Sequence, residues 1–168
     1  MAGNIPITTD FIDGDSLRIT GDSLTATLAD TLVTDSTDNK QEDVLDAPVA
    51  YQADDSLVWI VADAKAYLYK NSKVDYQKIG LTAEQITVDI DTKTVYAHGV
   101  KDSTGRETGK PIFKDGDTPY ESDTMSYNFK SRKGYISNVI TEQGEGYMTS
   151  KHAKKGADDA FYGGDGKY

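Results

Sequence analysis

The sequence predicts an all-β fold, an antiparallel sandwich, roll or barrel made of many short strands. Three observations predict it: apolar residues recur with period two, helical periodicity is almost absent, and turn-forming residues separate the alternating runs. Tyr, Thr, Val and Ile, which suit a pleated sheet, are frequent in these runs. The 168 residues are within the range of one domain with its own core.

Strands are expected where the alternation is clearest. Every second residue is apolar in 85–90 and in 124–129, and Ala66 and Leu68 alternate with more polar neighbours in 65–69. Alternation of this kind turns one face of a strand toward a dry interior and the other toward water.

Turns are predicted between these strands. Asp91–Lys93 has the length of a short hairpin loop, and Lys70–Lys73 and Lys133–Gly134 have turn composition. Asp102–Lys110 contains two glycines and is expected as a longer exposed connection.

A weak repeat recurs along the chain: a large apolar residue, a small residue two positions later, and then an acid. It occurs at Tyr51–Asp54, Leu81–Glu84 and Tyr120–Asp123. Repetition at this spacing indicates stacked supersecondary units, although any meander of hairpins gives similar repeated patterns.

The first 46 residues differ from the rest in charge. They contain ten acids against Arg18 and Lys40, a net charge of −8 out of −10 for the whole chain. We expect 1–46 as an acidic Asp/Thr/Ser-rich segment, either extra strands or a mobile arm, and 47–168 as the β domain. Neither part has the basic surface that nucleic acid requires, and the basic run 151–155 is typical of a solvated turn.

The tetrapeptide GDSL, the signature of a family of serine esterases, occurs at Gly14–Leu17 and Gly21–Leu24. A serine nucleophile needs a positioned base, which those esterases supply from Asp-x-x-His. Neither His98 nor His152 lies in that motif. We therefore predict no catalysis by Ser16 or Ser23 and no turnover of p-nitrophenyl esters, and we expect no enzyme.

A third copy of the pattern, Asp54–Leu57, lacks the glycine. Three copies favour a structural reading, in which Asp-Ser begins a strand after a turn. Leu17, Leu24 and Leu57 would then be the first residues of their strands to point inward.

Neither a metal site nor a cofactor is predicted. There is no Cys, and the two histidines lack zinc-site spacing. Asp-x-Asp occurs at 13–15, 89–91 and 115–117 without the glycine and distal Glu of a calcium loop. Gly163–Gly166 is not followed by a helical pattern, so it is no phosphate loop.

From Ala50 to about Lys155 the chain resembles the OstA-like family, the β-jellyroll domains of the lipopolysaccharide-transport (Lpt) system. Within this family it most resembles the N-terminal periplasmic domain of the outer-membrane lipopolysaccharide-assembly proteins of Bacteroidetes-type bacteria. YNFKSRKGYI followed by QGEGY is the most specific feature. The other matching stretches are AYQADDSLVW, AYLYKNSKVDYQKIGLTAEQITVDIDTKTVYAHGVKD and GKPIFKDG.

The resemblance implies an open, twisted, V-shaped antiparallel jellyroll of two sheets. It further implies a non-catalytic periplasmic domain that shields the acyl chains of lipopolysaccharide (LPS) in an apolar groove and passes LPS toward the outer membrane. The implied partners are LPS and other Lpt-type jellyroll domains stacked at strand edges, including head-to-tail copies of the chain itself. Residues 1–46 match less well and the start shows no signal peptide, so we expect a fragment of a larger outer-membrane protein or a soluble relative.

The alternation supplies the candidates for the groove lining, and the same residues would form the dry core of any closed sandwich. Trp59 and the many tyrosines suggest a rival function, a carbohydrate-binding or adhesin-type β-sandwich. A lipid groove predicts a continuous apolar channel, whereas a glycan binder predicts a filled core and an external aromatic patch. The candidate lining residues are Leu57, Leu68, Leu81, Ala83, Ile86, Val88, Ile90, Met125, Tyr127 and Phe129.

Overall fold

The computed structural model describes the backbone of residues 8–13, 16–20, 24–28, 45–143, 146–158 and 160–167. It describes side chains in 45–141, 147–158 and 160–167. All regular elements in these ranges are β-strands, and no helix there is long and apolar enough to cross a membrane.

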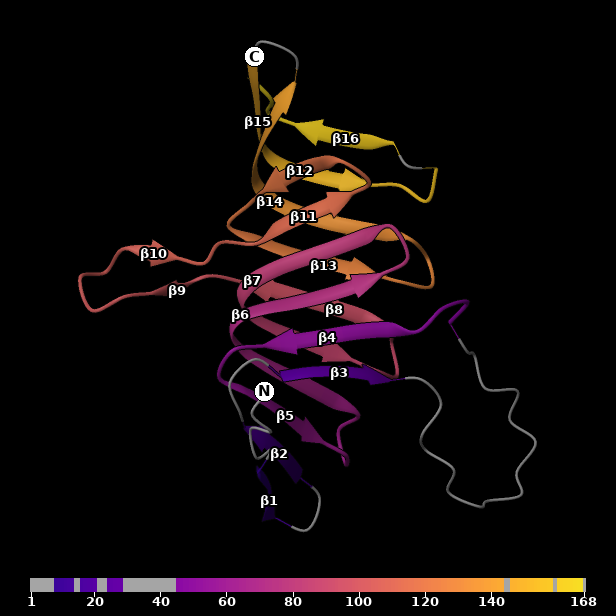
Figure 1. Cartoon of the computed structure of the whole chain (residues 1–168). Helices are drawn as coiled ribbons and strands as arrows, with labels where there is room; N and C mark the ends of the chain where they lie inside the picture. The colour runs from indigo at the N-terminus through magenta and orange to yellow at the C-terminus, as the bar shows by residue number, and fades with distance from the viewer. Residues whose placement is uncertain are drawn as a thin grey trace, which may run out of the picture.

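The strands follow the chain as shown in Figure 1. The first eight are β1 (Thr8–Asp13), β2 (Ser16–Thr20), β3 (Leu24–Leu28), β4 (Val49–Ala53), β5 (Ser56–Ile60), β6 (Lys65–Tyr76), β7 (Ile79–Asp89) and β8 (Thr94–His98). The others are β9 (Val100–Lys101), β10 (Glu107–Thr108), β11 (Ile112–Asp115), β12 (Thr118–Glu121), β13 (Thr124–Asn128), β14 (Lys133–Gln143), β15 (Gly146–Lys155) and β16 (Phe161–Gly164).

All strand pairs are antiparallel, which confirms the predicted all-β antiparallel class. Long strands hold the stack together by pairing with two short neighbours on one edge. β7 pairs with β6 along its whole length, so β11 (at 79–82) and β8 (at 85–89) share its other edge. β14 pairs with β15 in the same way and has β13 and β12 on its other edge.

The main sheet therefore closes on itself through six strands, β7-β11-β12-β14-β13-β8, with further strands above and below. This closed circuit differs from the open roll that the resemblance implies. The physical reason is that β7 and β14 each continue through both halves of the sheet, so the halves are joined by backbone as well as by packing.

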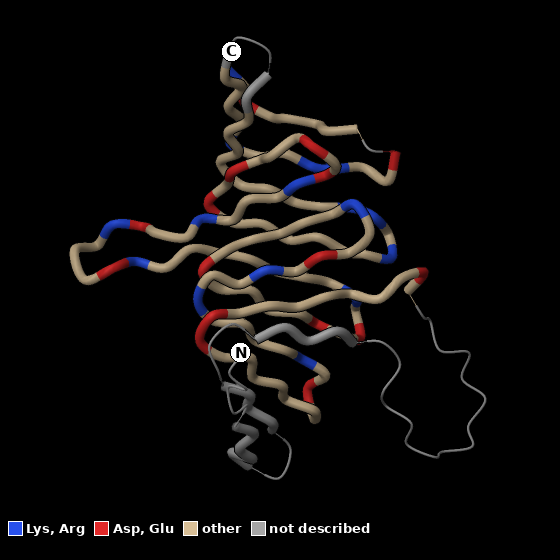
Figure 2. The backbone as a smooth tube through the Cα atoms, viewed as in Figure 1, with Lys and Arg blue, Asp and Glu red and all other residues tan. Residues whose placement is uncertain are grey.

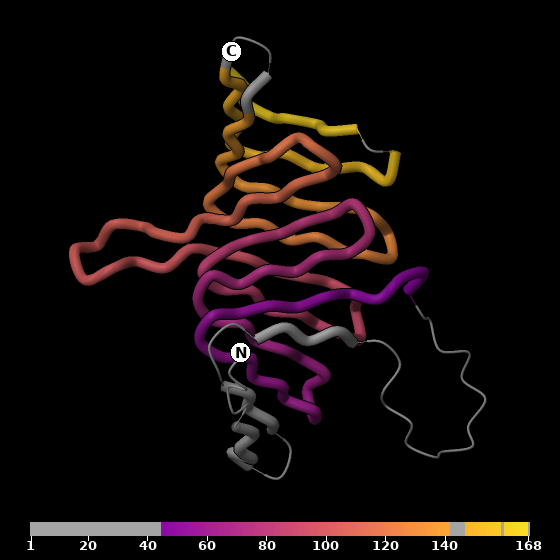
Figure 3. Tube along the Cα trace, in the orientation of Figure 1, coloured from indigo at the N-terminus to yellow at the C-terminus, as the bar shows by residue number. Residues whose placement is uncertain are grey.

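The two halves form two layers around one core. The first layer contains β4, β11, β12 and residues 72–76 of β6 and 79–83 of β7. The second contains β5, β8, β13, β16 and residues 65–69 of β6 and 85–89 of β7. Strands β14 and β15 run through both layers, because β14 pairs with β13 of the second layer at 133–137 and with β12 of the first layer at Ile140. Figure 3 traces the chain along the stack, from purple at β4 to yellow at β16.

The line where the chain passes from one layer to the other is called the crease. Along it, the backbone N–H groups of Asp54, Glu84 and Asp123 donate to the carbonyls of Lys70 (2.9 Å), Gly109 (2.8 Å) and Ser137 (3.1 Å). These three acids end the three copies of the sequence repeat. The small residue before each acid, Ala53, Ala83 or Ser122, is buried where the layers meet. The repeat thus marks the crease: its small residue is buried between the layers, and the acid that follows lies where the backbone passes from one layer to the other.

Three turns predicted from the sequence are wrong. The run 151–155, expected as a solvated turn, is the last part of strand β15, and its Lys155 is buried. Lys70–Lys73 does not end a strand: β6 continues through it with a one-residue bulge between Tyr69 and Ser72, and Lys70 and Asn71 have φ of 67° and 44°. The turn after β13 lies at 129–132, and Lys133 already begins β14. Asp91–Lys93 is a turn between β7 and β8 as predicted, and 102–110 carries part of the projecting β9–β10 hairpin.

The N-terminal strands extend the same sheet. β2 pairs with β5, β1 pairs with β2, and β3 pairs with β4. The boundary at residue 46 stays a prediction, as does the inward direction of Leu17 and Leu24, whose side chains lie outside the described residues. Figure 2 shows acidic and basic residues interspersed over the described backbone.

Candidate functional site

The apolar interior between the two layers is the main candidate site. Alternation along each strand and the pairing register bring the inward side chains into continuous rows. One row crosses seven adjacent strands of the second layer: Leu57, Leu68, Ile86, Ala97, Met125, Ile136 and Ala153. The apolar surface therefore runs through the whole described stack from β5 to β15.

The structure brings the predicted lining residues into this interior. Nine are buried in one cluster: Leu57, Leu68, Leu81, Ala83, Ile86, Val88, Met125, Tyr127 and Phe129. Ile90 is half-buried and packs against the cluster from the turn after β7, because the strand ends at Asp89. Phe129 likewise follows the end of β13.

The side of the interior opposite the crease is called the mouth. Here the turns 77–78 and 116–117 of the first layer face the turns 129–132 and 156–158 of the second (Figure 1). Backbone hydrogen bonds described at this side stay within one layer: Gly116 N–H to Lys78 O (3.2 Å) and Phe129 N–H to Lys93 O (2.9 Å).

Aromatic side chains close the mouth by contacts between the layers. The rings of Tyr76 and Phe129 have centroids 4.9 Å apart, and those of Tyr120 and Phe161 stack at 4.3 Å. Deeper in, Phe113 packs on Tyr127 with centroids 5.4 Å apart. Aromatic pairs of this kind add stability beyond area burial.

A buried ion pair also joins the layers at the mouth. Lys155 Nζ lies 2.9 Å from Asp115 Oδ2, and these side chains are 1% and 8% exposed. The second carboxylate oxygen, Asp115 Oδ1, lies 3.2 Å from the more exposed Lys78 Nζ. Burial, and to a lesser degree the Asp115 charge, raises the pKa of the neighbouring Tyr120 phenol. At the mouth, the apolar interior thus ends at the buried Lys155–Asp115 ion pair.

Sequence reasoning missed the mouth residues. Asp115 belongs to an Asp-x-Asp pattern that was considered as part of a calcium loop, and Lys155 belongs to a run interpreted as a solvated turn. The period-two pattern carried a usable signal for Lys155, because it stands two residues after Ala153 and so shares that residue's inward face. No such signal pairs Lys155 with Asp115, since strand order decides which side chains meet.

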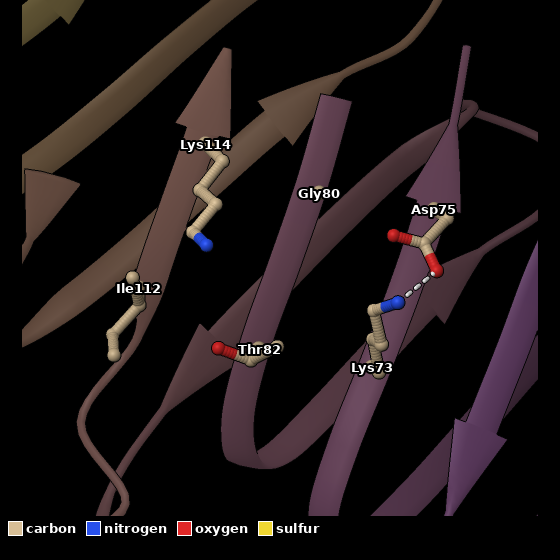
Figure 4. A pocket seen from close by; sticks show the side chains of 6 residues that line it. All are labelled: Lys73, Asp75, Gly80, Thr82, Ile112 and Lys114. Carbon is tan, nitrogen blue, oxygen red and sulfur yellow. Dashed lines mark ion pairs between the residues drawn. The ribbon is translucent and has the colours of Figure 1, made fainter. Parts of the chain in front are cut away.

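The outer surface of the first layer has a shallow depression of about 280 Å³. Figure 4 shows the side chains around it, with the Lys73–Asp75 ion pair (2.7 Å) at one side. It forms over Gly80, which has no side chain to fill the space between Asp75 and Lys114. Its exposed charges indicate an open surface feature without the enclosure typical of a small-molecule site.

The motifs considered for chemistry lie in structural positions. Asp89 accepts the Thr92 N–H at 2.9 Å, which holds the pKa of Asp89 below its usual range and caps a turn. Ser16 and Ser56 are the first residues of β2 and β5, and Leu57 points inward. Ser23 lies outside the described residues. Within the described ranges, no three His, Asp or Glu side chains are grouped as metal ligands.

Comparison with known proteins found no match: no protein-family model and no curated protein matches this chain.

Proposed function

We propose that this protein shields the acyl chains of LPS in the interior between its layers and passes LPS to neighbouring domains, without catalysis. The observation that carries the proposal is a continuous apolar interior that is closed at the mouth by side-chain contacts between the layers. The sequence resemblance to the OstA-like family supports the same reading.

The interior is long enough for this cargo. Seven adjacent strands from β5 to β15 give six intervals of about 4.8 Å, or roughly 29 Å of apolar surface. This exceeds the extended length of an ordinary fatty acyl chain. Each CH₂ removed from water contributes about 0.8 kcal/mol, so an acyl chain bound along several strands is strongly favoured over an acyl chain exposed to water.

An acyl chain needs room that the closed structure fills with side chains, because the lining residues pack against one another. We therefore propose that the loaded form is the V-shaped roll, opened at the mouth. Opening there separates aromatic pairs and the Lys155–Asp115 ion pair and leaves the strand ladders at the crease intact. The flexible Met125 side chain suits a lipid of variable shape.

Neighbouring domains would join at the ends of the stack. Among the described strands, β16 pairs only with β15 and β1 only with β2, so each offers an edge for an added strand. The proposed partners are other Lpt-type jellyroll domains, or further copies of this chain head to tail, in the periplasm.

The packed interior agrees equally well with the rival suggested by the sequence, a glycan-binding sandwich with a filled core. Lipid contact at the interior therefore has to be measured directly. A photoreactive benzoylphenylalanine placed at Val88 or Tyr127, in protein expressed in a Gram-negative periplasm, probes the inner face. The neighbouring Thr87 and Ser126 point outward and are matched controls on the same strands.

The expected result is a cross-linked band that reacts with anti-LPS antibody from the inner positions and none from the outer ones. Circular dichroism on each purified variant establishes that the β fold is retained. Folded protein without an LPS adduct at either inner position would overturn the proposal.

A second arm tests the mouth itself. The chain has no Cys, so a cysteine pair replacing Tyr120 and Phe161 can be tied with a short bifunctional maleimide. A pair replacing Lys73 and Thr82, neighbours within the first layer, is the control. Tying the mouth should abolish LPS cross-linking at Val88, and tying the control pair should leave it unchanged. Equal cross-linking in both would contradict entry through the mouth.

A further inference from the structure

The outer face of the second layer carries a regular row of tyrosines. Pairing register places one residue from each of eight adjacent strands in this row. From β5 to β16 these residues are Val58, Tyr67, Thr87, Tyr96, Ser126, Tyr135, Lys154 and Tyr162. Every second strand therefore supplies a tyrosine, namely β6, β8, β14 and β16. The strands between them, β7, β13 and β15, supply Thr, Ser and Lys.

The tyrosine rings are available to a ligand. Tyr96 is 46% exposed, and Tyr135 and Tyr162 are each 59% exposed, while Tyr67 is half-buried. Neighbouring strands lie about 4.8 Å apart, so successive tyrosines in the row are roughly 9.5 Å apart. Thr87 and Ser126, which stand between the rings, have small side chains.

Polar side chains border the row on both sides. One flanking row carries hydroxyl, amide and imidazole groups in place of aliphatic ones, and the other carries mixed charge. The first is Tyr69, Gln85, His98, Thr124, Ser137 and His152, and the second is Lys65, Asp89, Thr94, Asn128 and Lys133. Hydrogen-bonding groups thus lie on either side of a line of aromatic rings.

Local contacts orient three of the rings. Lys154 Nζ lies 5.1 Å from the Tyr135 ring centroid, and the Tyr162 hydroxyl donates to Asp158 Oδ2 at 3.1 Å. Tyr96 and His98 have ring centroids 5.9 Å apart. These contacts limit the freedom of the side chains, which lowers the entropy that a ligand must remove.

The outer face of the first layer gives the contrast. Its corresponding row contains Gln52, Lys73, Thr82, Ile112, Glu121, Ile140 and Thr149. That row has no aromatic residue. Period-two alternation alone therefore does not account for the row of tyrosines on the second layer.

We propose that the tyrosine row binds an extended chain of β-1,4-linked pyranose sugars. Pyranose rings stack their C–H faces on aromatic rings, and their hydroxyls need donors and acceptors at the sides. In an extended β-1,4 chain every second ring faces the same way, and this disaccharide repeat is close to the spacing of the tyrosines. A lipid surface would call for aliphatic residues between the rings, and this part of the row has none.

This binding face is independent of the acyl-chain interior, because its side chains point away from it. The test is calorimetric titration of the full chain with the β-1,4-linked hexamer and dimer of N-acetylglucosamine. The hexamer reaches several tyrosines and the dimer only one interval, so the hexamer should bind more tightly.

Variants assign the site. Tyr96→Ala or Tyr135→Ala should each weaken hexamer binding by about two- to tenfold, and Tyr135→Phe should retain it because stacking needs only the ring. Tyr147→Ala is the matched control, since Tyr147 is 66% exposed and lies outside the row. All three side chains are exposed, so their removal leaves the core intact.

Absence of hexamer binding by the folded protein would overturn the proposal. So would an affinity that is the same for dimer and hexamer, or one that falls as much in Tyr147→Ala as in Tyr135→Ala. LPS cross-linking at Val88 should be unchanged in Tyr135→Ala, so failure of the sugar site and failure of the lipid interior are distinguishable.

Discussion

Lys155 Nζ lies 2.9 Å from Asp115 Oδ2 across the interior, and this ion pair joins a strand of one layer to a strand of the other. Lys155 stands in the same inward row as Tyr127, and Asp115 stands at the end of β11. An ion pair with this little exposure has a large desolvation cost, which is offset only while both partners are present. Loss of one partner at the mouth should therefore lower the free energy of unfolding.

Removing one partner should destabilise the fold. Lys155→Met leaves the Asp115 carboxylate buried with the exposed Lys78 as a weaker ion-pair partner, and we expect a loss of about 3 kcal/mol in the free energy of unfolding. The double variant Lys155→Met/Asp115→Leu should regain most of this loss, because no unpaired charge remains. Urea denaturation followed by circular dichroism measures both.

The exposed pair Lys73–Asp75 provides the control for this prediction. Lys73→Met should change stability by less than about 1 kcal/mol, since both side chains are nearly half exposed. If Lys155→Met were as mild as Lys73→Met, the buried pair would not hold the layers together.

Gly109 should be sensitive to a single added methyl group. Its φ is 61°, and a Cβ there would lie 2.6 Å from Glu84 Cβ and 3.1 Å from Glu84 Cα. Gly109→Ala should displace the carbonyl that accepts the Glu84 N–H at the crease and cost roughly 2 kcal/mol or more. Gly105→Ala, at φ 80° with nothing within 4 Å of the added Cβ, should cost only about 1 kcal/mol of backbone strain. Equal midpoints of thermal unfolding for the two variants would contradict a specific role of Gly109.

Alkaline pH should weaken the fold through Tyr51. Burial raises the pKa of Tyr51 to about 12 from an ordinary 10.0, so the folded protein holds the phenolic proton more tightly than the unfolded chain does. The stabilisation is complete below pH 10.0 and is lost as the pH rises toward about 12, by about 1.4 kcal/mol per pH unit. Urea unfolding at pH 9 to 11 should show this loss in the native sequence and a smaller loss in Tyr51→Phe. A Tyr135→Phe variant, which alters an exposed ring, is the control and should behave like the native sequence. If Tyr51→Phe and the native sequence lost the same stability with rising pH, the loss would not be due to Tyr51.

Much of the second layer could be predicted from alternation. Ile86, Met125 and their neighbours at every second position are inward, because a pleated strand sends successive side chains to opposite faces whatever its partners are. Turn composition located the β7–β8 turn but placed two others wrongly. Lys70 and Asn71 read as a turn, yet pairing on both edges of β6 carries the strand through them as a bulge.

The surfaces on which the two proposals rest could not be predicted without the strand register. Tyr96, Tyr135 and Tyr162 are far apart in the sequence and form a row only because β8, β13, β14, β15 and β16 pair in one order. The Lys155–Asp115 pair depends in the same way on which layer each strand joins. The closed six-stranded circuit likewise depends on β7 and β14 each holding two short neighbours on one edge.

The sequence by itself determined the all-β class, the inward faces of the main strands and the small-residue positions that became the crease, because these follow from local alternation and side-chain size. The tertiary structure alone decided the circuit, the mouth and the row of tyrosines. These arise from hydrogen bonds between strands distant in the chain, and a one-residue change of register would send each of those side chains to the opposite face.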